Sequence, residues 1–318
     1  MRIVIAIGGN AMTAADGQAT PEGQRAAIRS AAEPVAELVA TGHEVLLTHG
    51  NGPQVGNLLV KNELAAEVVP PIGLDWCGAQ TQGTIGMLML NALDDAFNAR
   101  GIERPVAALV SRTLVDADDP GFTRPTKPIG RFLTREEAAP LMAHGQTFIQ
   151  VPGRGWRRVV ASPVPSECLD STSAESLMDS GFVVVCSGGG GIPTIRDPSG
   201  EYRGVEAVID KDLTAALIAT QVRADLLVIA TDVDAVVTDW GTERARPVNE
   251  VTAAQMRQIA EEQQFAPGSM GPKVEAVTSF AETGQGTGVI TSLTTIGAAV
   301  AGLAGTRVVP IPQANLTG

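Results

Sequence analysis

The chain has 318 residues, 44% of them hydrophobic and 18% charged, and its formal net charge is −12 at pH 7. This balance is typical of a compact globular protein, and the acidity disfavours a nucleic-acid-binding function. Because no apolar run approaches the ~20 residues needed to cross a bilayer, and because three cysteines without a CxxC pair disfavour disulfides and zinc, we expect a cytoplasmic protein without membrane contact.

Strand-like and helix-like segments alternate along the chain, which predicts an α/β fold with a largely parallel sheet. The first part predicts a strand at Arg2–Ile7, a helix from about Pro21 to Thr41, a strand at Glu44–Thr48, helices from Pro53 and from about Asp75 to Arg100, and a strand at Pro105–Val110. The last part predicts a helix that Thr172 and Glu175 open as a capping box, strands at Phe182–Cys186 and Asp225–Ala230, helices at Asp212–Val222, Thr252–Gln263 and Ser269–Thr283, and strands at Gly288–Thr291 and Thr306–Pro310.

The middle of the chain differs from this alternation. Residues 114–164 are rich in Pro, Gly and Asp, with short strand-like pieces and one short helix that opens with a capping box from Thr134 to Glu137. We interpret this stretch as a small subdomain inserted into the main sheet.

Three predicted strands end in glycine-rich turns, namely Gly8-Gly9-Asn10, Gly50-Asn51-Gly52 and Gly188 to Gly191. Ligands of parallel sheets bind at the carboxyl ends of strands, and glycine lets a backbone N–H approach an anion without a Cβ in the way. One such turn is ordinary tight-turn chemistry, but three after apolar strands favour an anion or nucleotide site. The sequence has neither a GxxxxGK[ST] P-loop nor a GxGxxG turn in a first βαβ unit, which disfavours a P-loop ATPase and a nicotinamide dehydrogenase.

Lysine is rare, because arginine fills most cationic positions and only Lys61, Lys127, Lys211 and Lys273 are lysine. Lys61 lies in a polar helical stretch and has an ordinary surface role. Lys127 is held between two prolines, Lys211 lies at a strand-to-helix junction between Asp210 and Asp212, and Lys273 begins a helix, where an ammonium opposes the helix dipole unless an anion is bound. Either aspartate could simply cap the helix.

This combination favours phosphoryl transfer, which depends mainly on positioning and on charge neutralisation by cations and N–H donors. An acceptor of the carboxylate type is already ionised at neutral pH and needs no general base. The sequence agrees, because it contains no convincing His/Asp or Ser/His pair, and His49 before the second turn is interpreted as structural.

At this point the sequence resembles the carbamate kinases, a branch of the amino acid kinase superfamily. The resemblance runs almost end to end, through IGGNAM (7–12), THGNGPQVG (48–56), CGAQTQGTIG (77–86), PTKPIG (125–130), GWRRVVASPVP (155–165), SGGGGIP (187–193), AVIDKD (207–212), TDVD (231–234) and GSMGPKVEA (268–276). It departs from the family at Val237, where relatives often carry an aromatic residue, at Ala161 and at Arg131.

The resemblance implies a three-layer αβα sandwich with a mainly parallel open sheet and a small protruding subdomain at about 114–164. It also implies one amino acid kinase domain over 1–318, with a carbamate-binding lobe at about 1–205 and a nucleotide-binding lobe at about 206–318. The implied reaction is ATP plus carbamate to ADP plus carbamoyl phosphate, reversible and dependent on Mg²⁺ with ATP or ADP, in a cytoplasmic homodimer that binds no nucleic acid.

Family roles transfer to the matching positions of this sequence. The resemblance implies that Lys127, Lys211, Lys273 and Asp210 are catalytic, with Asp210 organising the lysines. It implies that carbamate or the transferring group contacts Gly8, Gly9, Asn10, Gly50, Asn51 and Gly52. It implies that the nucleotide contacts Lys211, Lys273 and the segments 230–237 and 268–270, and the candidate residues are Asp232, Val237, Met270 and Gly271. We expect no dedicated metal ligands on the protein.

Two alternatives stay open on the sequence. One is a kinase of another small carboxylate or phosphonate, and the other is a non-catalytic nucleotide-sensing homologue. The pathway is also open, because arginine, purine or allantoin breakdown and carbamoyl phosphate synthesis would use the same chemistry, although the high transfer potential of carbamoyl phosphate favours ATP synthesis.

Overall fold

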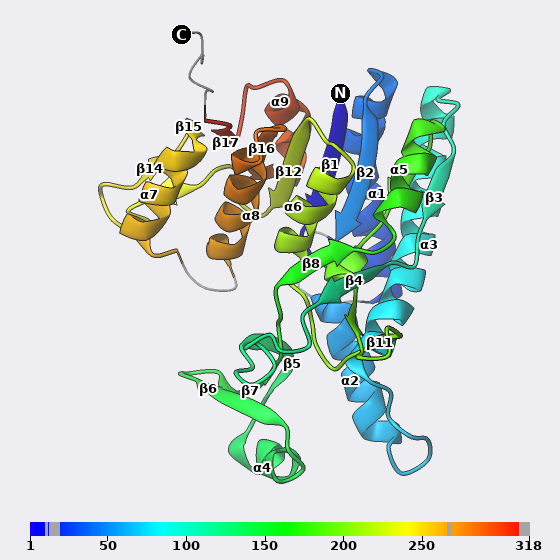
Figure 1. The fold of residues 1–318 in the computed structure, drawn as a ribbon, viewed down its shortest axis with the longest axis vertical. Coiled ribbons are helices and arrows are strands. Elements are labelled where there is room, and N and C mark those ends of the chain that lie inside the picture. The colour runs from blue at the N-terminus through cyan, green and yellow to red at the C-terminus, as the bar shows by residue number, and fades with distance from the viewer. Residues whose placement is uncertain (10–11, 13–19, 266–268, 312–318) are drawn as a thin grey trace.

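An eight-stranded sheet forms the centre of the computed structural model, which describes residues 1–9, 12, 20–265 and 269–311 (Figure 1). The strand order is β15 (Glu250–Thr252), β17 (Thr306–Val309), β16 (Thr287–Ser292), β12 (Leu226–Thr231), β1 (Arg2–Ile7), β2 (Glu44–His49), β9 (Val183–Val185) and β3 (Val106–Ala108). The strands from β16 to β3 run parallel, and only β17 and β15 at one edge are reversed. The predicted, mainly parallel α/β fold is confirmed.

Helices cover both faces of this sheet, because its strands are apolar on both sides. In β1, Ile3, Ile5 and Ile7 belong to one buried cluster, and Val4 and Ala6 belong to another. The first cluster includes residues of α1 (Pro21–Ala40), α3 (Leu74–Arg100) and α9 (Ile296–Val300). The second includes residues of α5 (Ser171–Asp179), α6 (Lys211–Gln221), α7 (Ala253–Gln263) and α8 (Met270–Glu282). The result is a three-layer αβα sandwich.

A three-stranded antiparallel sheet projects from the lower end of the molecule in Figure 1, together with α4 (Arg135–Ala143). Its order is β5 (Lys127–Leu133), β7 (Gly155–Val160) and β6 (Thr147–Val151). A small apolar cluster joins it to α2 (Gly52–Ala65), with Val55 and Leu59 packed near Ile129 and Val160. This contact places the start of β5, and therefore Lys127, beside the main body.

Two further strand groups complete the sheets, and the first of them pairs segments that are far apart in sequence. A four-stranded sheet has the order β11 (Tyr202–Gly204), β10 (Ile192–Arg196), β4 (Arg112–Val115) and β8 (Pro165–Cys168), and a two-stranded hairpin joins β13 (Val237–Thr238) to β14 (Arg246–Pro247). The short helices η2 (Gly188–Gly190) and η3 (Leu293–Thr295) complete the described elements.

The two predicted capping boxes have different outcomes. In α4 the Thr134 hydroxyl accepts from the Glu137 N–H, and the Glu137 carboxylate accepts from the Thr134 N–H, as expected. The box predicted for Thr172 and Glu175 is wrong, because α5 begins at Ser171 with Asp170 as its N-cap. Asp170 makes no capping bond, since its carboxylate binds the backbone N–H and the guanidinium of Arg112.

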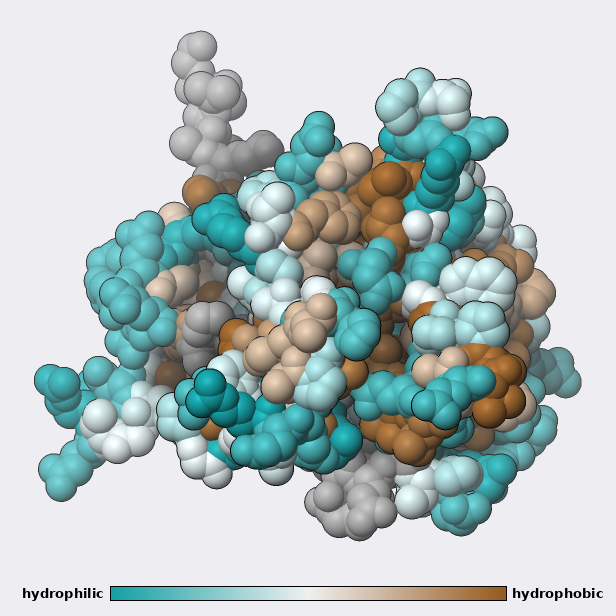
Figure 2. All heavy atoms as spheres, turned by 90° about the horizontal axis from the view of Figure 1, so that it is seen from below, coloured by the Kyte–Doolittle hydropathy of each residue, from teal (hydrophilic) through white to brown (hydrophobic). Residues whose placement is uncertain are grey.

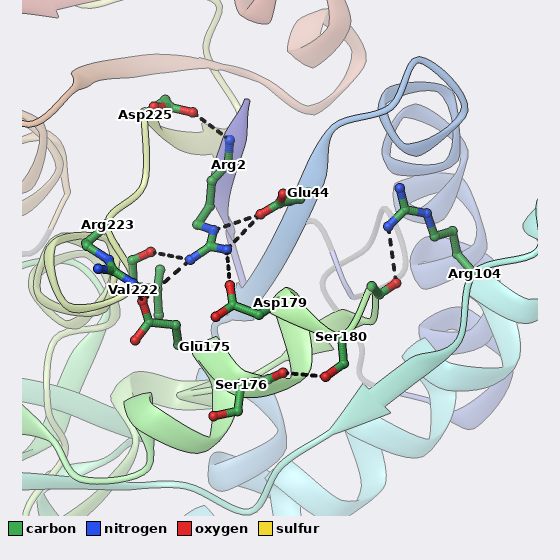
Figure 3. Close-up of polar contacts among 11 residues, drawn as sticks. Arg2, Glu44, Arg104, Glu175, Ser176, Asp179, Ser180, Val222, Arg223 and Asp225 are labelled. Atoms are coloured by element: carbon green, nitrogen blue, oxygen red, sulfur yellow. Dashed lines mark hydrogen bonds and ion pairs between the residues drawn. The ribbon is translucent and has the colours of Figure 1, made fainter.

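The amino ends of the central strands are joined by a polar cluster around Arg2 (Figure 3). The Arg2 side chain binds Glu44 on β2, Asp179 on α5 and the carbonyl of Val222, and its backbone N–H donates to Asp225 before β12. These contacts hold the amino ends of the strands together, whereas the glycine turns follow their carboxyl ends.

The lower face of the molecule is mostly hydrophilic, with separate hydrophobic patches between the polar side chains (Figure 2). No helix in the described ranges is both long and apolar enough to cross a membrane.

Candidate functional site

The predicted glycine turns meet at one edge of the sheet, because β1, β2 and β9 are neighbouring parallel strands. The first turn is held against β12 by the Gly8 N–H, which donates to the Ala230 carbonyl at 3.0 Å. The second is held against β1 by the Gly50 N–H, which donates to the Ile7 carbonyl at 2.9 Å. Strand order therefore converts three separate sequence motifs into one cluster.

The first two turns touch, and their contact requires glycine. A Cβ on Gly50 would lie 2.7 Å from the Gly9 nitrogen and 3.2 Å from Cδ of Lys211. No side chain larger than hydrogen fits there unless the turns move apart. The backbones of Gly9 and Gly50 and the stem of Lys211 are therefore in close contact.

The third turn closes behind the second. Gly189 has a positive φ of 69°, and a Cβ on it would lie 2.1 Å from Nδ2 of Asn51. Asn51 is buried and donates from the same Nδ2 to the Thr81 hydroxyl at 2.9 Å, while Gln82 donates to the Gly188 carbonyl. The Asn51 side chain is thus fixed between α3 and η2. Gly52 is the first residue of α2 and is exposed.

Lys127 reaches the main body through Asp210, whose carboxylate lies 2.5 Å from its Nζ. Asp210 is the N-cap of α6, and its other oxygen accepts from the Asp212 backbone N–H at 2.9 Å. One carboxylate therefore both caps the helix and holds the lysine of the projecting sheet. Asp210 was expected to organise all the lysines, but its only ion pair in the described structure is with Lys127.

Lys211 and Lys273 instead share Asp212, a residue that sequence reasoning considered only as a possible cap. The Asp212 carboxylate binds Nζ of Lys211 through one oxygen and Nζ of Lys273, at 3.1 Å, through the other. Burial alone would raise the pKa of Asp212, but the two ammonium groups outweigh it and hold the pKa below its ordinary value. Asp212 is thus an ionised, buried carboxylate that sets the spacing of two lysines.

A pocket of about 680 Å³ opens beside these groups. Its polar and glycine lining residues are Gly8, Gly9, Thr231, Asp232, Ser269, Lys211 and Lys273, and its apolar lining residues are Val233, Ala235, Val237, Trp240, Phe265 and Met270. The lining thus combines two lysines with several large apolar side chains, which suit the phosphates and the base of a nucleotide.

The pocket contains three of the four remaining nucleotide candidates, since Asp232, Val237 and Met270 line it. Gly271 lines a separate cavity of about 150 Å³ beside α7 and α8. Asn10 and Gly268 lie outside the described residues. Sequence reasoning missed Trp240 and Phe265, although Trp240 follows soon after Val237, the position where an aromatic residue was expected.

His49 ends β2 and is completely buried. Burial lowers its pKa to about 4, an effect that its hydrogen bond with the Gly50 carbonyl opposes and the nearby charge of Lys211 reinforces. The imidazole is therefore neutral at pH 7 and unable to act there as a cation.

The described residues contain no group of three or more His, Cys, Asp or Glu side chains arranged to hold a metal ion. Asp210 and Asp212 are occupied by lysines, whereas Asp232 lines the pocket with an exposed carboxylate. Mg²⁺ commonly binds through one or two carboxylates together with substrate phosphates and water. The donor set therefore fits an ion that enters with a nucleotide.

Comparison with known proteins agrees with this geometry. The family model described as "Amino acid kinase family" matches residues 1–292. The chain is 42% identical over 313 residues to a carbamate kinase of Trichomonas vaginalis, covering 98% of this chain and 100% of the relative. It is 42% identical over 312 residues to the carbamate kinase of Thermococcus kodakarensis, covering 97% and 99%.

A solved carbamate kinase of Giardia lamblia bound to AMP-PNP superposes with a TM-score of 0.91 at 40% identity, and 98% of each chain is covered. This chain therefore belongs to the amino acid kinase family and, within it, to the carbamate kinases.

Proposed function

We propose that this protein catalyses reversible phosphoryl transfer, ATP plus carbamate to ADP plus carbamoyl phosphate, and that it works mainly towards ATP synthesis. The observation that carries the proposal is the convergence of Lys127, Lys211 and Lys273 on touching glycine turns beside a nucleotide-sized pocket. Membership in the carbamate kinases supports carbamate as the acceptor.

The pocket gives each part of the nucleotide a place. In this proposal the base packs against the apolar side chains of Val237, Trp240 and Met270, and the phosphates bind Lys211 and Lys273. Lys273 is in the first turn of α8, so the positive end of the helix dipole adds to its charge. Mg²⁺ bound with the nucleotide would neutralise phosphate charge, and Asp232 is the carboxylate best placed to orient it.

The acceptor lies against the first two glycine turns, beside their contact. The backbone N–H groups of Gly9 and Asn51 provide uncharged donors for the small anion, and Lys127 provides a cation from the projecting sheet. In the transfer, the oxygen of carbamate attacks the γ-phosphorus and the bond to the ADP oxygen breaks, so that no proton has to move. The lysines stabilise the charge that spreads over the equatorial oxygens.

The wider organisation follows from the same proposal. Residues 1–205 supply the acceptor lobe with its subdomain at 114–164, and residues 206–318 supply the nucleotide lobe. Family membership supports a cytoplasmic homodimer.

The test is ATP formation by the purified protein from ADP, Mg²⁺ and carbamoyl phosphate, measured by luciferase luminescence. Acetyl phosphate serves as the comparison donor, because it would reveal a kinase of another carboxylate. ATP formation from carbamoyl phosphate well above that from acetyl phosphate is expected. No ATP from carbamoyl phosphate across pH and metal conditions would rule the proposal out, and nucleotide binding without turnover would indicate a sensing homologue.

A further inference from the structure

His49 is a buried polar residue that the proposed chemistry does not yet use. It is 1% exposed, and its ring packs directly against η2, since a Cβ on Gly188 would lie 2.2 Å from its Nε2. Its Nδ1 lies 2.9 Å from the carbonyl oxygen of Gly50, the next residue. The ring therefore sits between the second and third glycine turns and makes a directed hydrogen bond to the second.

The contact defines the tautomer of the ring. A carbonyl oxygen can only accept a hydrogen bond, so Nδ1 of His49 must carry the proton and donate it to Gly50. The ring is neutral at pH 7, as burial and the neighbouring Lys211 require. The His49 side chain therefore acts on the second turn as a neutral hydrogen-bond donor through Nδ1.

The hydrogen bond from His49 to the Gly50 carbonyl also sets the direction of the Asn51 N–H. The described residues contain no cis peptide bond, so the Gly50 C=O and the Asn51 N–H lie in one rigid plane and point in opposite directions. Holding the carbonyl on the imidazole therefore directs the Asn51 N–H away from it. The Asn51 nitrogen lies 3.8 Å from the position of a Cβ on Gly9, which lines the pocket together with Lys211.

The Asn51 N–H has a free donor position. Within the described ranges, no backbone or side-chain acceptor binds it, although the Asn51 carbonyl accepts from Val55 and the Asn51 side chain binds Thr81. Asn51 is also the N-cap residue of α2, where backbone N–H groups lack partners within the helix. A buried, oriented and unpaired N–H beside a cationic site is the kind of donor that stabilises a developing negative charge.

We infer that His49 is a positioning residue for the proposed phosphoryl transfer, because its Nδ1–H holds the Gly50–Asn51 peptide so that the Asn51 N–H faces the anionic acceptor. This inference deepens the proposed function and rests on it. His49 itself touches neither substrate nor nucleotide.

The kinetic test compares two variants, H49N and H49Q, whose amide side chains differ only in length. In H49N the side-chain nitrogen occupies the place of Nδ1 and can donate to Gly50, whereas in H49Q it lies near the place of Nε2 and cannot. H144Q is the matched control, because His144 makes a similar Nδ1 contact to the Pro140 carbonyl at 2.7 Å on α4, far from the glycine turns. An ADP-induced rise in Tm shows that each variant keeps its nucleotide pocket.

We expect H49Q to lower kcat for ATP formation by roughly 100-fold with little change in the KM for ADP, as for the loss of one oriented donor. The kcat of H49N should be at least about tenfold higher than that of H49Q, and the kcat of H144Q should match that of the wild type. Equal kcat values for H49N and H49Q, or a loss confined to the KM for ADP, would overturn the positioning role.

A second measurement needs neither a variant nor turnover. The ¹⁵N chemical shifts of His49 in the wild-type protein report its tautomer, and Nδ1–H is expected between pH 6 and 8. A ring protonated on Nε2 alone would overturn the inference even in an active enzyme. An inactive wild type with the Nδ1–H tautomer would instead contradict the proposed function, so the two failures are distinguishable.

Discussion

Lys127 and Asp210 are 83 positions apart in sequence, yet their side chains form an ion pair of 2.5 Å between the projecting sheet and the N-cap of α6. The other two lysines of the site bind Asp212, which lies in the first turn of the same helix. The start of α6 therefore organises all three cations, with one carboxylate for the lysine of the subdomain and another for the lysines beside the pocket.

Replacing Lys127 with Ala is expected to lower kcat/KM for ATP formation by about 100-fold or more, because a cation at the transferring group is lost. The free energy of unfolding should change by only about 1 kcal/mol, since both partners of the pair are partly exposed. Steady-state kinetics and urea denaturation measure the two quantities. K61A is the control, because Lys61 is exposed on α2. A loss of stability in proportion to the loss of activity would contradict a functional role.

The two aspartates should respond differently to neutralisation. D212N leaves two ammonium groups close together without a carboxylate in a buried position, which is expected to cost about 3–5 kcal/mol of stability as well as most turnover. D210N keeps an amide oxygen to cap α6 and should retain most stability while losing turnover. Thermal denaturation of both variants measures the difference in stability. A D210N protein that is less stable than D212N would show that Asp210, rather than Asp212, is the aspartate needed for stability.

Trp240 lines the pocket although it is 75% exposed, and the residues on either side, Asp239 and Gly241, have positive φ values. We expect W240A to raise the KM for ADP roughly tenfold with little change in kcat, because one stacking contact contributes about 1 kcal/mol or somewhat more. Trp76, exposed on α3 outside the pocket, provides the control W76A. Quenching of Trp fluorescence by ADP should disappear in W240A alone, and quenching that survives there would place the base elsewhere.

Most of the central sheet and the location of the site could be predicted from sequence, because apolar strands and glycine turns are local signals. The four-stranded sheet could not, since Arg112–Val115 pairs with Ile192–Arg196, a partner far away in the chain that no local pattern identifies. The sequence also could not predict that Asp210 pairs with Lys127 while Asp212 pairs with Lys211 and Lys273. This pairing depends on which residue is the extended N-cap and which lies in the first helical turn.

His49 makes stability depend on pH. Its pKa is about 4 in the folded protein and about 6.5 when exposed, so between these values the unfolded chain binds more protons. The contribution of His49 to the free energy of unfolding is therefore fully present above pH 6.5. It is lost as the pH drops towards 4, by on the order of 3 kcal/mol in total. Urea midpoints between pH 4 and 8 measure this slope. An H49N protein should show a shallower slope, and an unchanged slope would assign the effect to other groups.

The three lysines lie in a chain whose net charge is −12, and this contrast affects how substrates arrive. Nucleotides and carbamoyl phosphate are anions that the molecule as a whole repels over about 30 Å at 0.01 M salt but over only about 10 Å at 0.1 M salt, where the charges are screened. Moderate ionic strength should weaken this repulsion before it weakens the short-range attraction of the lysines. We therefore expect the association rate for ADP, measured by stopped-flow fluorescence, to rise with salt up to about 0.1 M and then to fall, whereas a cationic protein would show a decline throughout.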